Sequence, residues 1–231
     1  MKIYGMEKLS LVDFDGKITC TIFTGGCNFA CPFCHNGSLA ISPSLNQELP
    51  FEEVLDYLKL RKKMVDAVCI TGGEPTLYND LKDYFKLFKE MGFITKLDTN
   101  GTNPIVLASL VEDGLVDYVA MDVKNSYDNY FKTIGVENDK LLANVKESIN
   151  YLLENHVPYE FRTTIVEELH SEDDMKKLAK MLKGANAYFL QHFIASPNCI
   201  KQGLHEIKKE KASNYLEIIK KEIPNASLRG Y

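Results

Sequence analysis

Three cysteines with the spacing Cys27-x-x-x-Cys31-x-x-Cys34 lie within eight residues and form the most reactive group in the sequence. Three thiolates on one short loop can bind three irons of a cubane cluster, whereas a closed electron-transfer cluster uses four. Three protein ligands leave one metal position free, as they do in catalytic zinc sites. The segment from residue 25 to residue 36, called the cysteine loop below, therefore predicts a metal site with an open coordination position.

A zinc site built from the same three cysteines and His35 is the alternative. Adjacent ligands such as Cys34 and His35 fit tetrahedral coordination poorly, and zinc sites usually draw a second ligand pair from farther along the chain. The other cysteines, Cys20, Cys69 and Cys199, are scattered. This distribution differs from the disulfide framework of a small secreted protein and indicates a reducing compartment.

Three further polar segments each follow a run of apolar residues. They are Gly72-Gly73-Glu74-Pro75, Asp98-Thr99-Asn100-Gly101 and Asp122-Val123-Lys124. In parallel β/α proteins the active site lies at the carboxyl ends of the strands. We therefore expect these segments and the cysteine loop to meet at one edge of a sheet.

The apolar periodicity alternates between that of strands and that of helices. Strands are predicted at residues 18–23, 67–71, 94–98, 118–123, 159–166 and 188–193. Helices are predicted from residue 51, from Leu81 with Asn79 as N-cap and Gly92 as stop, from Asn103-Pro104, at 139–155, from Ser171 to Gly184, and at 210–222.

This order predicts an α/β fold with parallel strands and right-handed crossovers. Since eight units close a full barrel, the six predicted here indicate a six-unit, three-quarter β/α barrel. A doubly wound open sheet is the alternative. We expect one domain over residues 1–231, with a core at about 10–195 and a helical extension at 196–231.

Composition narrows the function classes. The chain has 231 residues, 45% of them hydrophobic, and 27 Lys plus Arg against 32 Asp plus Glu give a net charge of −5. An acidic balance argues against a nucleic-acid partner. No apolar run is long enough to cross a membrane, and residues 1–13 lack the apolar region of a signal peptide. A cytoplasmic location is expected.

The pattern C-x-x-x-C-x-aromatic-C, with Phe33 before the last cysteine, resembles the signature of the radical S-adenosylmethionine superfamily. The resemblance implies that Cys27, Cys31 and Cys34 bind a 4Fe–4S cluster, whose fourth iron is chelated by S-adenosylmethionine. The segment Gly72–Pro75 is similar to the second motif of that superfamily.

The same resemblance implies a cofactor-binding role for Gly72, Gly73 and Glu74, and also for Phe33. Glycines let the backbone approach a ligand closely. The carboxylate of Glu74 would accept a hydrogen bond from the methionine ammonium group.

Within the superfamily, Cys34-His35-Asn36 and the segments that begin at Asp98 and Asp122 resemble the glycyl-radical-enzyme activating branch. The resemblance implies a monovalent cation bound by Asp98, Thr99 and Asp122. Two carboxylates that face one pocket repel each other unless a cation lies between them.

Four residues are further cofactor-binding candidates on the same basis. They are Asn100, Lys124, Arg162 on the fifth predicted strand and His192 at the end of the sixth. Asp98 is expected to contact the cofactor as well as the cation. A structural ion pair for Arg162 and a structural role for His192 are the alternatives.

The run from Ser10 to Lys17 and the small size are most similar to the anaerobic ribonucleotide reductase activating proteins. The resemblance implies a glycyl radical enzyme as the macromolecular substrate and a flavodoxin or ferredoxin as electron donor. Pyruvate formate-lyase activation, a small-molecule reaction of the 7-carboxy-7-deazaguanine synthase type, and a non-catalytic iron–sulfur or zinc module are the alternatives.

Overall fold

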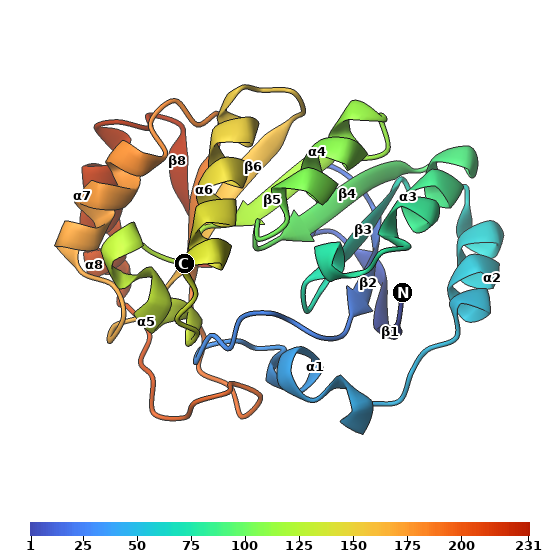
Figure 1. Ribbon diagram of the computed structural model, residues 1–231, viewed down its shortest axis with the longest axis horizontal. Coiled ribbons are helices and arrows are strands. Elements are labelled where there is room, and N and C mark those ends of the chain that lie inside the picture. Colours follow the sequence, from blue (N-terminus) through green and yellow to red (C-terminus); the bar gives the residue numbers. More distant parts are fainter.

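The computed structural model describes all 231 residues and contains one curved sheet of eight strands, paired in chain order (Figure 1). The first two strands are antiparallel, and all later pairs are parallel. The strands are β1 (Ile3–Ser10), β2 (Thr19–Thr24), β3 (Ala67–Gly72), β4 (Ile94–Thr99), β5 (Tyr118–Asp122), β6 (Tyr159–Ile165), β7 (Tyr188–His192) and β8 (Ala226–Arg229).

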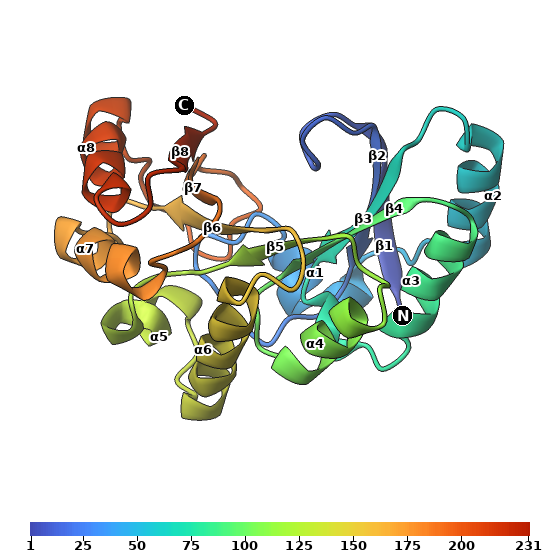
Figure 2. The same cartoon turned by 90° about the horizontal axis from the view of Figure 1, so that it is seen from above.

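Helices follow the parallel strands and cover the convex side of the sheet (Figure 2). The first strand of the sheet does not pair with the last, so the barrel is open between β1 and β8. The helices are α1 (Gly37–Ile41), α2 (Phe51–Arg61), α3 (Leu81–Glu90), α4 (Pro104–Glu112), α5 (Tyr130–Ile134), α6 (Asp139–Leu153), α7 (Glu172–Met181) and α8 (Lys209–Lys220), with short 3-10 turns at Pro43–Leu45, Pro75–Leu77 and Tyr127–Asn129.

The predicted α/β class with a mostly parallel sheet is confirmed, but the count of strands was too low. The six predicted strands correspond to β2–β7, and the sheet has eight. β1 was missed because it is an edge strand with exposed polar residues and no buried apolar run. β8 has four residues, too few for a periodic signal. Residues 196–231 are therefore not a purely helical extension, because β8 lies within them.

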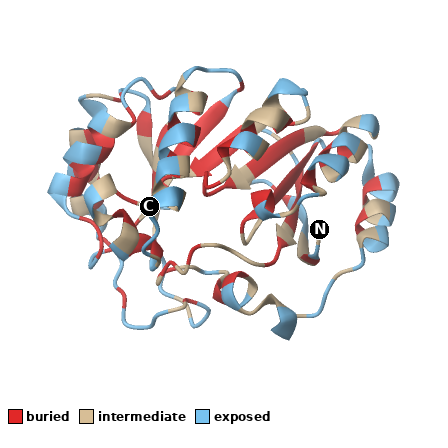
Figure 3. Ribbon diagram, in the orientation of Figure 1, coloured by how far each residue is buried: buried red, intermediate tan, exposed pale blue.

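The core fills the space between the sheet and its helices (Figure 3). Strand residues such as Ile22, Val68 and Ile70 are fully buried, and helical side chains such as Val54 and Phe85 pack against the sheet. Burying such a side chain contributes about 1.5–3 kcal/mol. No helix of the chain combines the length and the apolar character that a membrane crossing requires.

The helices begin at residues with local capping interactions, and one of the predicted N-caps is displaced by one residue. Asn103 accepts a hydrogen bond from the N–H of Val106 at 3.4 Å and begins α4. Ser171 and Asp174 form a capping box at the start of α7. The expected N-cap of α3, Asn79, is wrong by one residue. The N-cap is Asp80, whose carboxylate pairs with the amino group of Met1.

The register of the parallel strands brings the polar segments to one edge. Thr24 at the end of β2 lies opposite Gly72 at the end of β3, and Thr99 of β4 lies opposite Met121 of β5. Asp122, which ends β5, lies opposite Arg162 of β6. The residues that follow these strand ends consequently surround a common space.

Candidate functional site

A cavity of about 180 Å³ lies at the carboxyl ends of the strands and contains most of the predicted site residues. Its lining comes from the cysteine loop and from the ends of β3, β4, β5 and β6. The predicted residues that line it are Cys27, Cys31, Phe33, Cys34, Gly72, Gly73, Glu74, Asp98, Thr99, Asn100, Asp122 and Lys124. The cavity is therefore the candidate active site.

Backbone hydrogen bonds hold the cysteine loop at both ends. Near its start, the N–H of Cys27 donates to the carbonyl of Ala40 at 3.1 Å. Farther on, the N–H of Ala30 donates to Ile134 at 2.8 Å, and the N–H of Lys201 donates to Pro32 at 2.8 Å. The loop thus leaves β2, crosses to α5, and meets the segment that follows β7 (Figure 1).

Gly73 makes the closest approach of the β3 end to the cysteine loop. A Cβ atom at this position would lie 2.0 Å from the carbonyl oxygen of Gly26. Gly72 has a φ of 114°, a conformation that favours glycine, and a Cβ there would lie 2.4 Å from the backbone of Thr24. These two glycines are required for packing of the protein against itself, whether or not they also contact a ligand.

Burial favours the protonated, neutral form of the three thiols of the cysteine loop. Burial raises the pKa of Cys27 to about 11 and that of Cys31 to about 12, and it also raises the pKa of Cys34. Ionising all three thiols in this position therefore requires the positive charge of a metal. A bound iron–sulfur cluster would provide that charge.

The donor set fits a cluster with one open iron, because the three cysteines of the loop line the cavity and no fourth cysteine does. No three His, Cys, Asp or Glu side chains are grouped to hold a single metal ion. His35 also lines the cavity, with Nε2 2.8 Å from the carbonyl oxygen of Ile194 and its ring stacked on Phe193. Phe33 packs edge-on against the same Phe193 ring.

Glu74 is buried and joins the ends of β3 and β4. Its Oε1 accepts hydrogen bonds from the N–H and Oγ1 of Thr76 and from Oγ1 of Thr99. Its Oε2 accepts from the N–H of Asn100 at 2.6 Å. Burial raises the pKa of Glu74, and these hydrogen bonds oppose the rise. Because Oε1 has three donors and Oε2 has one, Oε2 has the free capacity to accept a hydrogen bond from a ligand.

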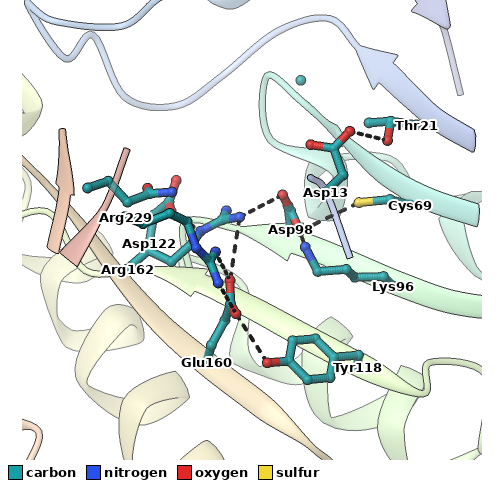
Figure 4. A network of polar contacts seen from close by, with 12 residues as sticks. Asp13, Thr21, Cys69, Lys96, Asp98, Tyr118, Asp122, Glu160, Arg162 and Arg229 are labelled. Atoms are coloured by element: carbon teal, nitrogen blue, oxygen red, sulfur yellow. Dashed lines mark hydrogen bonds and ion pairs between the residues drawn. The ribbon is translucent and has the colours of Figure 1, made fainter. Parts of the chain in front are cut away.

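Asp98 and Asp122 are linked by the guanidinium group of Arg162 (Figure 4). Nη1 of Arg162 lies 3.0 Å from Asp98, and Nε lies 2.9 Å from Asp122. Lys96 pairs with Asp98 at 2.7 Å, and Lys124 pairs with Asp122 at 2.9 Å. These five residues are called the ion-pair network below.

The ion-pair network places cationic side chains beside Asp98 and Asp122, and the expected monovalent cation at Asp98, Thr99 and Asp122 stays a prediction. Although burial by itself would raise their pKa values, Arg162 and the neighbouring lysines hold the pKa of both aspartates below the ordinary value. Thr99 turns its hydroxyl to Glu74. The guanidinium group of Arg162 lies between the two carboxylates and offsets part of their mutual repulsion.

Arg162 forms ion pairs within the protein, and its predicted contact to a cofactor stays a prediction. It lies behind the carboxylates and is not among the residues that line the cavity. The ion pairs with Asp98 and Asp122, and the position of Glu160 at 4.0 Å, make it the structural ion pair that was the alternative reading. It can act on a ligand through the carboxylates that it orients.

His192 does not reach the cavity either. Its Nδ1 lies 3.1 Å from the carbonyl oxygen of Gly230, and its Nε2 lies 3.3 Å from Glu206. The ring packs against Tyr231 at a centroid distance of 4.4 Å. The side chain of His192 thus contacts the C-terminal residues, and its expected contact to a cofactor stays a prediction.

Several residues of the site were missed from the sequence. Asn36, Thr71 and Thr164 line the cavity beside the predicted residues. His170 is buried and supports Lys124, with Nε2 2.9 Å from the carbonyl oxygen of that residue. Asn36 belongs to the segment Cys34-His35-Asn36, and Thr164 lies on the predicted strand of Arg162, but neither was assigned a role of its own. Thr71 adjoins the segment Gly72–Pro75, and His170 has no signal in the sequence.

Comparisons with known proteins agree with this arrangement. Residues 21–182 match the family model of the Radical SAM superfamily. A putative glycyl-radical enzyme activating enzyme of Methanocaldococcus jannaschii is 36% identical over 83% of this chain and 79% of its own length. The pyruvate formate-lyase-activating enzyme of Clostridium pasteurianum is 29% identical over 79% of this chain and 76% of its own length.

The fold has a counterpart among solved structures. A domain of pyruvate-formate lyase-activating enzyme from Bacteroides vulgatus superposes with a TM-score of 0.57 at 19% identity. The superposition covers 71% of this chain and 99% of that one. At this level of identity the likeness establishes the fold.

Proposed function

Because the chain belongs to the radical S-adenosylmethionine superfamily and to its glycyl-radical-enzyme activating enzymes, we propose that Cys27, Cys31 and Cys34 bind the 4Fe–4S cluster of this class. When bound and reduced by an external electron donor, the cluster and S-adenosylmethionine would supply one-electron cleavage of the sulfonium to methionine and a 5′-deoxyadenosyl radical, which would take a Cα hydrogen from a glycine of the partner. The chain's own residues bind and orient these groups.

The observation that supports the proposal is the convergence of four separate segments on one cavity. The cysteine loop, Gly72–Glu74, Asp98–Asn100 and Asp122–Lys124 all contribute to its lining. A non-catalytic metal module needs the first of these segments and has no use for the other three. An electron-transfer cluster would also need a fourth thiolate.

We assign the cofactor contacts by chemistry. Oε2 of Glu74 has room to accept from the methionine ammonium group. Lys124 carries a positive charge into the cavity, because its pairing with Asp122 raises its pKa despite burial. It is therefore suited to a carboxylate of the ligand. Gly72 and Gly73 let the β3 end lie close to the end of β2 and the cysteine loop.

For the partner we propose an anaerobic ribonucleotide reductase, with a reduced flavodoxin or ferredoxin as electron donor. The similarity of Ser10–Lys17 supports this reductase, and that run lies between β1 and β2 at the amino end of the parallel strands. Pyruvate formate-lyase is the second candidate, since relatives such as the Clostridium pasteurianum protein are named for it.

The test is activation of each candidate under anaerobic conditions. The reconstituted chain, S-adenosylmethionine and a reductant are mixed with the reductase or with the lyase, and the partner is examined by electron paramagnetic resonance. We expect a glycyl doublet in the reductase that disappears when its radical glycine is replaced by alanine. A doublet in the lyase alone would overturn the choice of partner and leave the class of enzyme intact.

A further inference from the structure

Asn100 does not have a free side chain to offer to a cofactor, because its amide is built into a closed ring of hydrogen bonds. Oγ1 of Thr102 donates to Oδ1 of Asn100 at 2.7 Å, and Nδ2 of Asn100 donates to Oδ1 of Asn28 at 2.9 Å. Nδ2 of Asn28 then donates to Oγ1 of Thr102 at 2.8 Å. We call these three residues the amide ring. It joins the cysteine loop to the segment that follows β4.

The direction of every hydrogen bond in the amide ring is determined by one backbone group. The N–H of Thr102 can only donate, and it lies 3.0 Å from Oδ1 of Asn100. Oδ1 is therefore the oxygen, and the amide nitrogen of Asn100 faces the opposite way. The orientation of this amide follows from the network and does not depend on an arbitrary assignment of its two ends.

The amide nitrogen of Asn100 has two hydrogens, and the ring uses one. The second has the sulfur of Cys27 as its partner, with Nδ2 and Sγ 3.8 Å apart. Asn100 is buried, so water does not compete for this hydrogen. The N–H of Phe29 donates to the same sulfur at 3.4 Å. Cys27 is thus the cysteine that receives a side-chain hydrogen bond from another strand end.

We propose that Asn100 is a positioning residue that orients the Cys27 sulfur toward the iron and raises the reduction potential of the cluster, an inference that rests on the proposed binding of the cluster by Cys27. A hydrogen bond to a ligating sulfur withdraws electron density and stabilises the cluster that has gained an electron, and such bonds are among the factors that set iron–sulfur potentials. The amide ring provides this donor in a fixed direction before the cluster binds.

The test is a redox titration of the reconstituted protein with dithionite, followed by the electron paramagnetic resonance signal of the reduced cluster. In Asn100→Ala the donor is lost. Hydrogen bonds to charged groups are stronger than those between neutral groups, and the reduced cluster carries one more negative charge than the oxidised one. We therefore expect the equilibrium constant for one-electron reduction to fall about tenfold, which corresponds to a midpoint potential about 59 mV lower.

Two matched controls separate the hydrogen bond from the packing of the loop. Asn28→Ala opens the amide ring but leaves the Asn100 amide oriented by the N–H of Thr102, so the midpoint should move much less. Asn144→Ala removes a hydrogen bond of 2.8 Å to the carbonyl of Thr102 and leaves the ring intact, so the midpoint should not move. Equal shifts in Asn28→Ala and Asn100→Ala would overturn the proposal.

Asn100→Asp keeps the shape of the side chain in case Asn100→Ala does not fold. An acceptor oxygen with negative charge would then face the sulfur, and the midpoint should fall further than in the alanine variant. An unchanged midpoint in Asn100→Asp would contradict the proposal. Iron analysis distinguishes the two levels of inference. If the unmodified protein holds no cluster, the proposed function fails. If the protein holds a cluster whose midpoint potential is unchanged in the Asn100 variants, the role of Asn100 fails and the proposed function stands.

Discussion

The cysteine loop and the two carboxylates of the ion-pair network line the same cavity, but their charges are balanced in different ways. Each carboxylate of the network has at least two cationic partners within 3.0 Å, all from the chain itself. The three thiols have two hydrogen-bond donors at Cys27 and no ion pair. The charges of the ion-pair network are balanced by the folded chain itself. The thiols of the cysteine loop would need a bound metal cofactor to balance their charges once they ionise.

This difference indicates separate roles for the two regions, with positioning by the ion-pair network and cofactor binding by the cysteine loop. Buried carboxylates that are paired in advance hold Lys124 and the strand ends in place at no cost when a ligand arrives. Thiols that burial keeps protonated release their protons only as metal binds, so metal binding and ionisation are coupled. We expect substitutions in the cysteine loop to affect the cofactor and those in the ion-pair network to affect the fold.

The largest effect is expected from Cys31→Ala. This variant removes a buried cysteine that we propose as a cluster ligand, so the iron content after anaerobic reconstitution should fall from about four per chain to near zero. Formation of methionine and 5′-deoxyadenosine from S-adenosylmethionine should decrease by more than about 100-fold. Cys20→Ala is the matched control, because Cys20 is buried in β2 and does not line the cavity. A full cluster in Cys31→Ala would contradict the assignment of Cys27, Cys31 and Cys34 as its ligands.

Arg162→Met tests the other side of the comparison. It leaves Asp98 and Asp122 facing each other with their shared partner gone, and breaking a buried ion pair in this way costs about 3–5 kcal/mol. The free energy of unfolding, measured by urea denaturation, should fall by that amount. Lys177→Ala removes an exposed lysine that pairs with Asp128 and Asp173, and it should cost no more than about 1 kcal/mol. Equal losses in the two variants would contradict a special role for the network.

A smaller effect is expected from acid. The pKa values of Asp98 and Asp122 are lowered in the folded chain, so the stability that these groups contribute is present above the unfolded pKa of about 3.9. It is lost as the pH falls through the lower folded values. The free energy of unfolding of the reduced, cluster-free chain should therefore decrease below about pH 4. The decrease should be less steep in Asp122→Asn, and an equal slope in both proteins would show that the pairing in the network adds no stability.

The site was predictable where its chemistry is local. The three cysteines stand on one loop, and the glycine–glutamate, aspartate–asparagine and aspartate–lysine segments each directly follow an apolar strand. Because the carboxyl ends of parallel strands share one edge, their position after a strand was enough to bring them together. The sequence by itself thus determined the central strands β2–β7, the common cavity and the resemblance that identified the class.

The partners of individual side chains were decided only by the tertiary structure. Arg162 is separated by 40 residues from Asp122 and by 64 from Asp98, and only the register of β4, β5 and β6 places its guanidinium between the two. The same holds for Asn100 and Asn28, which are 72 residues apart. An apolar run is a property of neighbours in the chain, and it is visible in the sequence. A charge or an amide is satisfied by whatever lies beside it in space, and that depends on the curvature and register of the whole sheet.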